Sequence, residues 1–488
     1  MDLEIKEAQV ERTAERCRER DIILPTYAQM KDPSLIPAQI HEELKGIGLW
    51  DVHPRNLFRI SWKNDPVTGG FHGVNYIEIP TQLTGIKTRI FALVGKYFPT
   101  GAHKVGATYG TLAPRVVTGT FDPTSQKAVW PSTGNYCRGG AYVASLLACD
   151  SVAILPEEMS QERFTWLRSI GSEVFATPGC ESNVKEIYDK CWELSAERGD
   201  NVVILNQFDE FGNPLWHYEV TASAIDEVLR AELGEGDRYF GFVSATGSAG
   251  TIGAGERLKE LYPGSKIIAS EALQCPTLLR NGFGGHRIEG IGDKHVPWVH
   301  NTKNTDMIVA VDDNAPMALI RLFNEPEGRA YLAEKGVPTE FIEQIDALGI
   351  SGISNVLTAI KAAKWWELDG SDALFTICTD SMEMYQSRLE EARAAHGPYT
   401  REQAAIDFAM HMQGQNTANM KELDHYDRLA VHNLKYFTWV EQQQKAVGEL
   451  NAQWYDKSYW TDKWKMAPLY DELIEAFNAR TGLLERYK

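Results

Sequence analysis

Short runs of β-branched and other apolar residues alternate with amphipathic segments along most of the chain. The apolar runs include SVAIL (151–155), NVVIL (201–205), YFGFVSA (239–245) and KIIAS (266–270), and the amphipathic segments include SQERFTWLRSIG (160–171) and ERLKELYP (256–263). Strands that are buried on both faces and alternate with helices are typical of parallel α/β folds. The pattern therefore predicts an α/β architecture from about Tyr76 to Leu389.

The two ends of the chain lack this alternation. Residues 1 to about 20 have the pattern of a charged helix, which three prolines between positions 25 and 37 follow as breakers. After about Ser387 the strand pattern stops, and residues 388–488 are predicted to be helical. That region is rich in aromatic residues, including Trp439, Trp454, Trp460 and Trp464. Aromatic residues at helical spacing favour packing against the main body over an exposed interaction surface.

Composition narrows the class of protein. The 488 residues contain 49 Lys and Arg against 67 Asp and Glu, so the formal net charge is −18. The length suggests roughly two to three domains with a large core. The hydrophobic fraction of 43% is that of a globular chain rather than a disordered one. The acidic balance argues against a general binder of nucleic acids or anionic membranes, since both need a basic face. This leaves a small-molecule enzyme as the favoured class.

Cysteine usage and the N-terminal segment indicate the cellular location. The seven cysteines are odd in number and widely spaced, with no C-x-x-C pair, which disfavours a disulfide framework and a structural zinc site. The N-terminal segment is charged and has no apolar stretch typical of a secretory signal. No run approaches the ~18–20 apolar residues of a membrane span. We therefore expect a cytoplasmic protein with reduced thiols and no bound metal, and neither a membrane nor a nucleic acid as partner.

The first segment whose residues could take part in catalysis is PTGAHKVGATYG (99–110). Lys104 follows a Pro-Thr-Gly turn at the predicted start of a helix whose early residues are small. Small neighbours leave room for a planar ligand against the lysine. The same pattern also fits a solvated lysine on a helix.

The second segment, PSTGNYCRGGA (131–141), follows the apolar lead-in KAVW. It offers hydroxyls, an amide and free backbone N–H groups at a predicted strand-to-helix turn, from Ser132, Thr133, Gly134 and Asn135. Such a turn suits a carboxylate or phenolate oxygen, because helix N-termini supply donors and a positive dipole. A plain helix N-cap is the alternative interpretation.

The third segment, VSATGSAGTIGAGERLKE (243–260), has the pattern of a strand, a glycine-rich bend and a helix. Consecutive backbone N–H groups of such a bend can wrap a phosphate, here at Gly247, Ser248, Ala249, Gly250 and Thr251. The spacing does not match the dinucleotide fingerprint, and the Gly-Lys-Ser/Thr of a P-loop is absent. A single phosphate is therefore favoured, with a tight turn as the alternative.

A lysine, an oxyanion-binding turn and a phosphate loop in this order suggest pyridoxal 5'-phosphate as cofactor. From about residue 76 to 390 the chain resembles the cysteine synthase and cystathionine β-synthase group of the fold-type-II (tryptophan synthase β-like) pyridoxal-phosphate enzymes. Six segments in the family's order carry the resemblance: PTGAHK (99–104), STGN (132–135), LPEEMSQERFTWLRSIGSEVFATPG (155–179), NQFDEFGNPLWHYEVT (206–221), GGHRIEGIG (284–292) and ICTDSMEMY (377–385).

The resemblance implies a fold and a domain organisation. We expect two domains, each with a twisted, mostly parallel sheet flanked by helices, and the cofactor in the cleft between them. Residues 76–390 would form this core, with a smaller substrate-loop domain at roughly 110–220 and a larger cofactor domain from the rest. Residues 1–75 would be an N-terminal extension and 391–488 a helical C-terminal extension. The family resemblance also implies a homodimer.

The resemblance assigns roles to individual residues. Lys104 would hold the cofactor as a Schiff base and then remove the Cα proton of the substrate, which requires a pKa lowered by desolvation. Asn135 would bind the phenolic oxygen of the cofactor, and Gly247 to Thr251 its phosphate. Ser381 would face the pyridine nitrogen, with Thr379 as the alternative. The substrate side would be formed by Ser132, Thr133, Gly134, Gln207 and Gly290.

A serine at the pyridine nitrogen bears on the reaction. A neutral hydroxyl does not force protonation of that nitrogen, so loss of a β-substituent is favoured over transamination. The expected activity is β-elimination or β-replacement on a β-substituted L-amino acid through an α-aminoacrylate. A threonine synthase-like or serine/threonine dehydratase-like reaction is the alternative. A more remote alternative is a non-catalytic relative that binds the cofactor.

The sequence also departs from the family's pattern. Phe98 stands where the family usually has Asn, and His103 is a feature of tryptophan synthase β. Pro131 stands near the position of that enzyme's catalytic glutamate, which disfavours indole chemistry. The phosphate loop reads Gly-Ser-Ala-Gly-Thr in place of Gly-Thr-Gly-Gly-Thr. The two extensions exceed a minimal cysteine synthase, and we expect them to cap the site or to enlarge a dimer interface.

Overall fold

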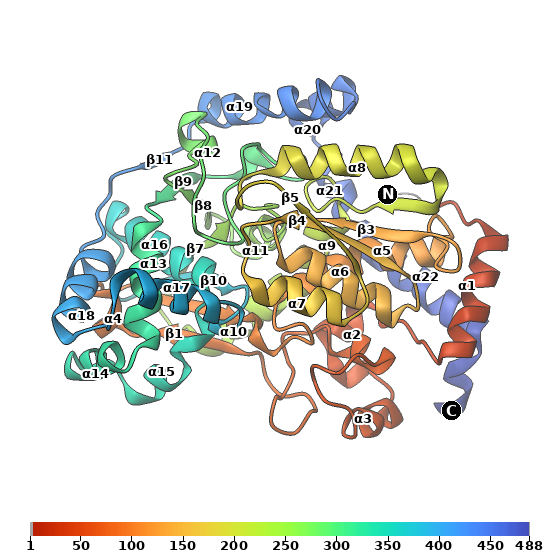
Figure 1. Cartoon of the computed structure of the whole chain (residues 1–488), viewed down its shortest axis with the longest axis horizontal. Helices are drawn as coiled ribbons and strands as arrows, with labels where there is room; N and C mark the ends of the chain where they lie inside the picture. Colours follow the sequence, from red (N-terminus) through yellow and green to blue (C-terminus); the bar gives the residue numbers. More distant parts are fainter. Residues whose placement is uncertain (1–2, 488) are drawn as a thin grey trace.

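The computed structural model describes residues 3–487, and its interior holds two separate β-sheets (Figure 1). The larger sheet has the strand order β1-β2-β10-β7-β8-β9-β11. Its strands are β1 (Tyr76–Ile79), β2 (Arg89–Val94), β10 (Asp372–Cys378), β7 (Arg238–Ala245), β8 (Lys266–Ala272), β9 (Met307–Val311) and β11 (Met420–Glu422). The strands from β2 to β9 pair in parallel, whereas the two edge strands β1 and β11 are antiparallel to their neighbours.

The smaller sheet is fully parallel and has the order β5-β4-β3-β6. Its strands are β5 (Glu173–Thr177), β4 (Ser151–Pro156), β3 (Lys127–Pro131) and β6 (Val202–Ile204). Every residue of β4 and of β10 is buried, as expected for strands covered on both faces. The α/β class predicted from the alternation of apolar and amphipathic segments is thereby confirmed.

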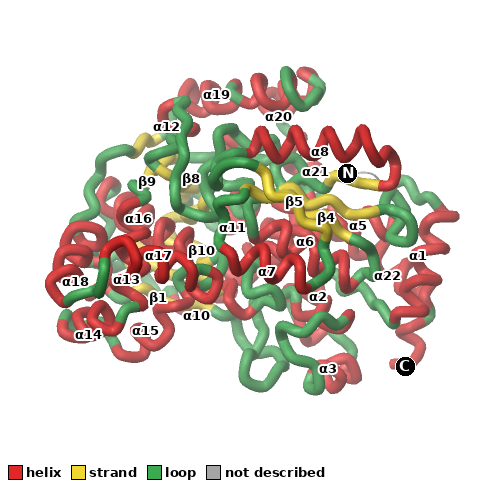
Figure 2. The backbone as a smooth tube through the Cα atoms, in the orientation of Figure 1, coloured by secondary structure: helices red, strands yellow, loops and turns green. Residues whose placement is uncertain are grey.

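Helices surround both sheets (Figure 2). Those of the first half are α1 (Glu7–Arg20), α2 (Tyr27–Lys31), α3 (Ala38–Leu44), α4 (Thr81–Thr84), α5 (Lys104–Thr118), α6 (Asn135–Leu146), α7 (Gln161–Ser169), α8 (Val184–Arg198), α9 (Gly212–Trp216), α10 (Ala222–Glu232) and α11 (Ile252–Leu261). Those of the second half are α12 (Thr277–Arg280), α13 (Asn314–Asn324), α14 (Pro326–Glu334), α15 (Thr339–Gln344), α16 (Ile350–Trp365), α17 (Gln386–His396), α18 (Arg401–Asp407), α19 (His425–Asn433), α20 (Val447–Tyr455), α21 (Tyr459–Trp464) and α22 (Met466–Thr481). Helix α16 is buried from Ile350 to Ala363 and packs on β10, β9 and β7, as its small and apolar residues on all sides require.

The two chain ends pack on each other and on α5. Helix α22 lies beside α1 (Figure 1), and both contact α5. The Asn478 side chain accepts a hydrogen bond from the Leu24 N–H at 3.0 Å and donates one to the Leu24 carbonyl at 2.8 Å. Asp471 accepts from the backbone N–H groups of Tyr27 and Ala28. The two chain ends therefore pack together against α5.

The C-terminal region is helical, as predicted, apart from one short strand. Its four tryptophans lie in or at the edge of the core, with exposed fractions of 0% to 8%, so the packing role predicted for them is confirmed. The expectation that strands stop after about Ser387 is wrong at β11. That strand pairs with the edge of the sheet through its backbone, while its side chains are partly or fully exposed. It therefore leaves no apolar pattern in the sequence.

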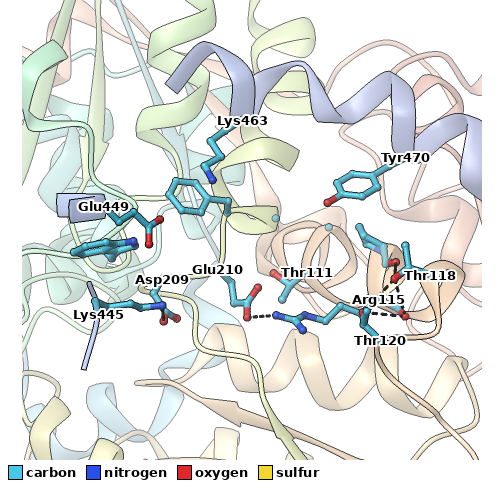
Figure 3. Close-up of a pocket in the computed structure, with 15 residues that line it drawn as sticks. Thr111, Arg115, Thr118, Thr120, Asp209, Glu210, Lys445, Glu449, Lys463 and Tyr470 are labelled. Carbon is cyan, nitrogen blue, oxygen red and sulfur yellow. Dashed lines mark hydrogen bonds and ion pairs between the residues drawn. The ribbon is translucent and has the colours of Figure 1, made fainter. Parts of the chain in front are cut away.

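A charged pocket of about 330 Å³ lies where the C-terminal region meets the core (Figure 3). The core supplies Arg115 from α5 together with Asp209 and Glu210, and the C-terminal region supplies Lys445 and Lys463. Arg115 pairs with Glu210 at 2.6 Å, and Lys445 pairs with Asp209 at 2.7 Å. Ion pairs therefore line the contact between the C-terminal region and α5, the helix that begins at Lys104. No helix within residues 3–487 is long and apolar enough to cross a membrane.

Candidate active site

The predicted site residues follow the carboxyl ends of parallel strands in both sheets. In the larger sheet, the segments after β2, β10 and β7 carry Lys104, Thr379 and Ser248, and these three strands are adjacent. In the smaller sheet, the segments after β3 and β6 carry the 132–135 loop and Gln207. Carboxyl ends of parallel strands share one edge of a sheet, which is where α/β proteins bind ligands. The topology therefore brings together residues that lie far apart in the sequence.

Lys104 is the first residue of α5, as predicted. Its Nζ donates a hydrogen bond to the Ser248 Oγ at 2.9 Å. Burial lowers the pKa of Lys104 to about 8, against the opposing effect of the carboxyl groups of Asp293 and Glu181. A solvated helical lysine would show neither feature. The lysine is partly buried and held against the glycine-rich loop.

That loop, residues 246–251, connects β7 to α11. Ser248 Oγ also accepts a hydrogen bond from the Asn213 amide at 3.0 Å. Ala249 has φ +58°, a left-handed conformation that lets the loop turn back towards the helix start. A Cβ on Gly250 would collide with the Asn213 side chain, so the backbone is approached closely at this position. Thr251 is held by its hydroxyl contact with Ser244 at 2.6 Å.

Gly247 lies against the second glycine-rich stretch. A Cβ at Gly247 would stand 2.8 Å from the Gly290 carbonyl oxygen, and the Gly292 N–H donates to the Thr246 carbonyl at 3.2 Å. Gly290 itself has φ +98°, which favours glycine. The two glycine-rich segments thus pack backbone against backbone.

The 132–135 loop joins β3 to α6. Ser132 Oγ accepts from the Gly134 N–H at 2.9 Å and from the Gln207 amide at 3.4 Å. Gly134 has φ +153°, and a Cβ there would stand 2.6 Å from the Arg163 Nε. Thr133 is buried, with an exposed fraction of 8%. The structure therefore brings the predicted substrate residues of this loop together with Gln207.

Asn135 begins α6 and reaches the segment after β10. Its Nδ2 donates to the Asp380 carboxylate at 2.7 Å, while its Oδ1 is buried without a hydrogen-bond partner among residues 3–487. Thr379 contacts His103: its carbonyl accepts from the His103 N–H at 3.2 Å, and its hydroxyl lies 3.3 Å from the His103 Nε2. Ser381 is buried, but no hydrogen bond within the described part of the chain ties it to another predicted site residue. Of the two residues predicted for the pyridine nitrogen, Thr379 is the one linked to the lysine segment.

Sequence reasoning missed a set of buried charged residues around the site. Arg163 is fully buried and pairs with Glu289, and its NH2 group donates to the Tyr385 hydroxyl at 3.0 Å. Asp380 accepts from that hydroxyl at 2.6 Å. Asp293 directly follows the glycine-rich stretch GGHRIEGIG. Its position next to a predicted cofactor segment was the sequence signal that could have identified it as a site residue. For Asp380, the signal was an acidic residue two positions after the mostly apolar strand β10.

Burial determines the charge state of these groups. It raises the pKa of Asp293 to about 8, with Lys104 acting in the opposite direction, and raises the pKa of Asp380 above its usual range. Burial likewise raises the pKa of Glu181 well above its usual range. The pKa of His103 is held well below its ordinary value by burial and by the adjacent Lys104. The site is therefore a low-dielectric region in which burial favours the uncharged forms of the carboxyl groups and of the lysine.

The donor set fits pyridoxal phosphate. Lys104 supplies an amine that can join the aldehyde, and the loop before α11 supplies a hydroxyl and helix-start N–H groups for a phosphate. The Nδ2 of Asn135 donates one of its two N–H groups to Asp380, and the second N–H can donate to the phenolic oxygen of the cofactor. Residues 3–487 contain no group of three or more His, Cys, Asp or Glu side chains placed to hold a metal ion.

Comparison with known proteins agrees with this geometry. Residues 72–333 match the family model described as pyridoxal-phosphate dependent enzyme. The chain belongs to this family. This match confirms the family resemblance that was based on the six segments. It also confirms pyridoxal phosphate as the predicted cofactor.

Individual relatives match only part of the length of this chain. The chain is 27% identical over 319 residues to a cystathionine beta-synthase from Apis mellifera, which covers 62% of this chain and 61% of that protein. It is 31% identical over 260 residues to a cysteine synthase from Staphylococcus aureus, covering 53% and 75%. A solved structure of a hydrogen sulfide-producing enzyme from Fusobacterium nucleatum matches with a TM-score of 0.54 at 24% identity, covering 64% of this chain and 95% of that one. The chain thus spans less than two thirds of the bee protein.

Proposed function

We propose that this pyridoxal-phosphate enzyme catalyses β-elimination or β-replacement on a β-substituted L-amino acid. The observation that carries the proposal is the contact of Lys104 with Ser248, which joins a desolvated amine to the glycine-rich loop at the carboxyl edge of the sheet. The names of the relatives support the reaction class, since they include cysteine synthases and cystathionine beta-synthases.

The cofactor side would use three elements of this chain. Ser248 and the backbone N–H groups up to Thr251 would hold the phosphate at the start of α11. The amide of Asn135 would bind the phenolic oxygen, and Lys104 would carry the aldehyde carbon. When bound, pyridoxal phosphate supplies an electron sink for negative charge at the substrate Cα. Thr379 and Ser381 are the candidates to face the pyridine nitrogen.

The substrate side would use the loop after β3. The hydroxyls of Ser132 and Thr133 and the N–H groups at the start of α6 would bind the substrate carboxylate, with Gln207 holding the loop. Lys104, once released, would take the Cα proton. A pKa of about 8 leaves about a tenth of its amine unprotonated at pH 7, far more than for an ordinary lysine, and a general base needs this neutral form.

The proposal also covers the quaternary structure and the cellular location of the enzyme. The enzyme is proposed to act as a cytoplasmic homodimer, with a substrate-loop domain at roughly 110–220 inside the 76–390 core. The few unpaired cysteines and the family resemblance support this. Light scattering of the purified holoenzyme measures the subunit number, and a monomeric mass contradicts it.

Borohydride reduction followed by peptide mapping tests the proposal. A label on Lys104 is expected, and a label on another lysine, or no bound chromophore, overturns it. Absorbance spectra recorded with amino acids that carry acetyl, phosphate, sulfur, sulfonate or hydroxyl at Cβ then identify the leaving group. Release of pyruvate distinguishes elimination from replacement. If no such amino acid changes the spectrum, the reaction class is wrong.

A further inference from the structure

The charged pocket between α5 and the C-terminal region is separate from the site around Lys104. It is lined by the second half of α5, by the segment 209–212 and by residues of the C-terminal region, and its volume is about 330 Å³. Lys104, Ser248 and Asn135 are not among the residues that line it. Pockets that bind small molecules have volumes of roughly 300–1,000 Å³. The cavity is therefore large enough for one small metabolite.

Two ion pairs within residues 3–487 neutralise four of the six charged side chains that line the pocket. Arg115 of α5 pairs with Glu210 at 2.6 Å. Lys445 of the C-terminal region pairs with Asp209 at 2.7 Å. Both carboxylates of these pairs belong to the segment 209–212, so this segment contacts α5 on one side and the C-terminal region on the other.

The other two charged side chains of the pocket, Lys463 and Glu449, form no ion pair within residues 3–487 (Figure 3). Lys463 is half-buried, and its Nζ lies 4.7 Å from the centre of the Phe211 ring and 5.0 Å from that of the Tyr459 ring. The Oε1 of Glu449 accepts a hydrogen bond from the neutral Tyr459 hydroxyl at 2.7 Å. Tyr459 therefore has an ammonium group over its ring and a carboxylate at its hydroxyl, and neither has a partner of opposite charge.

A ligand that is complementary to this arrangement carries both charges. A carboxylate can pair with Lys463 and an ammonium group with Glu449, and a free α-amino acid has both groups on one carbon atom near neutral pH. A phosphate or a dicarboxylate would meet the charge of Lys463 but would face the like charge of Glu449, which disfavours binding. The indole of Trp298, which also lines the pocket, can contact the side chain of such a ligand.

The segment 209–212 is continuous with the residues that hold two loops of the active site. Gln207 precedes it, and the Gln207 amide donates to the Ser132 Oγ at 3.4 Å. Asn213 follows it, and the Asn213 amide donates to the Ser248 Oγ at 3.0 Å and to the Gln207 carbonyl at 2.9 Å. One short stretch of chain therefore forms a wall of the pocket and carries the side chains that hold the substrate loop and the phosphate loop.

We propose that this pocket binds a free α-amino acid as an activator of the enzyme. The carboxylate of the activator pairs with Lys463, its ammonium group pairs with Glu449, and the bound molecule fills the space between the C-terminal region and the segment 209–212. Binding favours the arrangement in which Gln207 and Asn213 hold both loops, because the ligand has its contacts only there. The activator is not converted, so its binding goes beyond the proposed function, whereas its effect on turnover rests on that function.

Equilibrium dialysis of the borohydride-reduced holoenzyme with each of the common L-amino acids tests the binding. Reduction fixes the cofactor on Lys104, so an amino acid can no longer join the cofactor. Saturable binding is expected, and Lys463→Met should weaken it by about 10-fold or more, since a hydrogen bond between charged groups is lost. Lys465→Met is the matched control and should bind as the wild type does, because the Lys465 side chain is 72% exposed. Binding of no amino acid, or equal binding by Lys463→Met and the wild type, overturns the proposal.

A second variant tests the contact with the ammonium group. The amino acid that binds best is compared with the carboxylic acid that lacks only its amino group. Glu449→Gln should weaken binding of the amino acid by about 10-fold or more and should not weaken binding of the carboxylic acid. The glutamine oxygen can still accept from the Tyr459 hydroxyl, so the change removes the charge and keeps that hydrogen bond. Equal losses for the two ligands would exclude an amino acid as the natural occupant.

Steady-state kinetics test the coupling to the active site. The amino acid should raise kcat/KM of the wild-type holoenzyme by about 5-fold or more and should have no such effect on Lys463→Met. Competition at the active site would instead lower the rate in both proteins. Lys463→Met should keep the cofactor absorbance and melting temperature of the wild type, which shows that the variant is folded. Binding without a change in rate refutes the activating role. If no β-substituted amino acid is turned over, the proposed function fails, and the dialysis results still decide whether the pocket binds an amino acid.

Discussion

The Nζ of Lys104 lies 2.9 Å from the Oγ of Ser248, although 144 positions separate the two residues in the sequence. Lys104 begins α5 after β2, and Ser248 precedes α11 after β7. The two strands β2 and β7 lie on either side of β10 and run parallel to it, so their carboxyl ends lie at the same edge of the sheet. The sheet therefore fixes the separation of the amine and the phosphate loop before any ligand binds, and such preorganisation favours catalysis.

Substitution Lys104→Ala should abolish turnover and remove the visible absorbance of a lysine-bound cofactor. The amine is the group that attaches the aldehyde, and no other described lysine contacts Ser248. Absorbance spectra and product assays measure both effects. Lys185→Ala is the matched control, because that lysine is on the surface with a side-chain exposure of 72%. Activity retained in the Lys104 variant would contradict the assignment.

Substitution Ser248→Ala should weaken cofactor retention by about 5-fold, since a hydrogen bond in this setting contributes about 1 kcal/mol. The hydroxyl accepts hydrogen bonds from both Lys104 and Asn213. Dialysis followed by fluorescence titration with pyridoxal phosphate measures the dissociation constant. The exposed Ser169→Ala should leave it unchanged. Equal affinities for the two variants would exclude a phosphate contact at Ser248.

Gly250→Ala should displace the phosphate loop, because the new Cβ would collide with the Asn213 side chain. We expect loss of bound cofactor and a lower melting temperature. Gly448→Ala offers the contrast: it lies in α20 with no atom near the new Cβ, so it should be neutral or stabilise by up to about 1 kcal/mol. Differential scanning calorimetry compares them. A stable Gly250→Ala holoenzyme would show that the loop can move aside.

Arg163→Met should destabilise the fold by about 3–5 kcal/mol, because Glu289 and Asp380 would lose the buried cation beside them. Denaturant unfolding measures the change. Arg168→Met on the same helix is the control, since Arg168 is exposed and should cost little. A similar small loss for both arginines would mean that the buried carboxyls are satisfied without Arg163.

The contribution of Glu271 and Glu256 to stability should fall as the pH rises from about 4.5 to 8. Burial raises the pKa of Glu271 from 4.5 to about 8 and that of Glu256 from 4.5 to about 7. The folded chain therefore binds more protons than the unfolded chain in that window, and deprotonation favours unfolding. Urea unfolding at a series of pH values measures the slope. Glu271→Gln should make it shallower, whereas an unchanged slope would show that Glu271 ionises normally.

Local sequence was sufficient for several features of this protein. The α/β class, the start of α5 at Lys104 and the two strand-loop-helix segments follow from apolar periodicity and from the glycines of nearby turns. These signals are local because turns and helix starts depend on neighbouring residues. The six family segments added the cofactor.

Only the tertiary structure decided which polar residues are desolvated. Asp293, Glu181 and Asp380 look like ordinary acidic residues in the sequence, but strands and loops from distant positions cover them and raise their pKa values. The link of Thr379 to His103 and the pairing of β11 with β9 likewise depend on contacts between remote segments. Burial is a property of the whole packed chain, so the electrostatics of the site could not be inferred from the order of its residues.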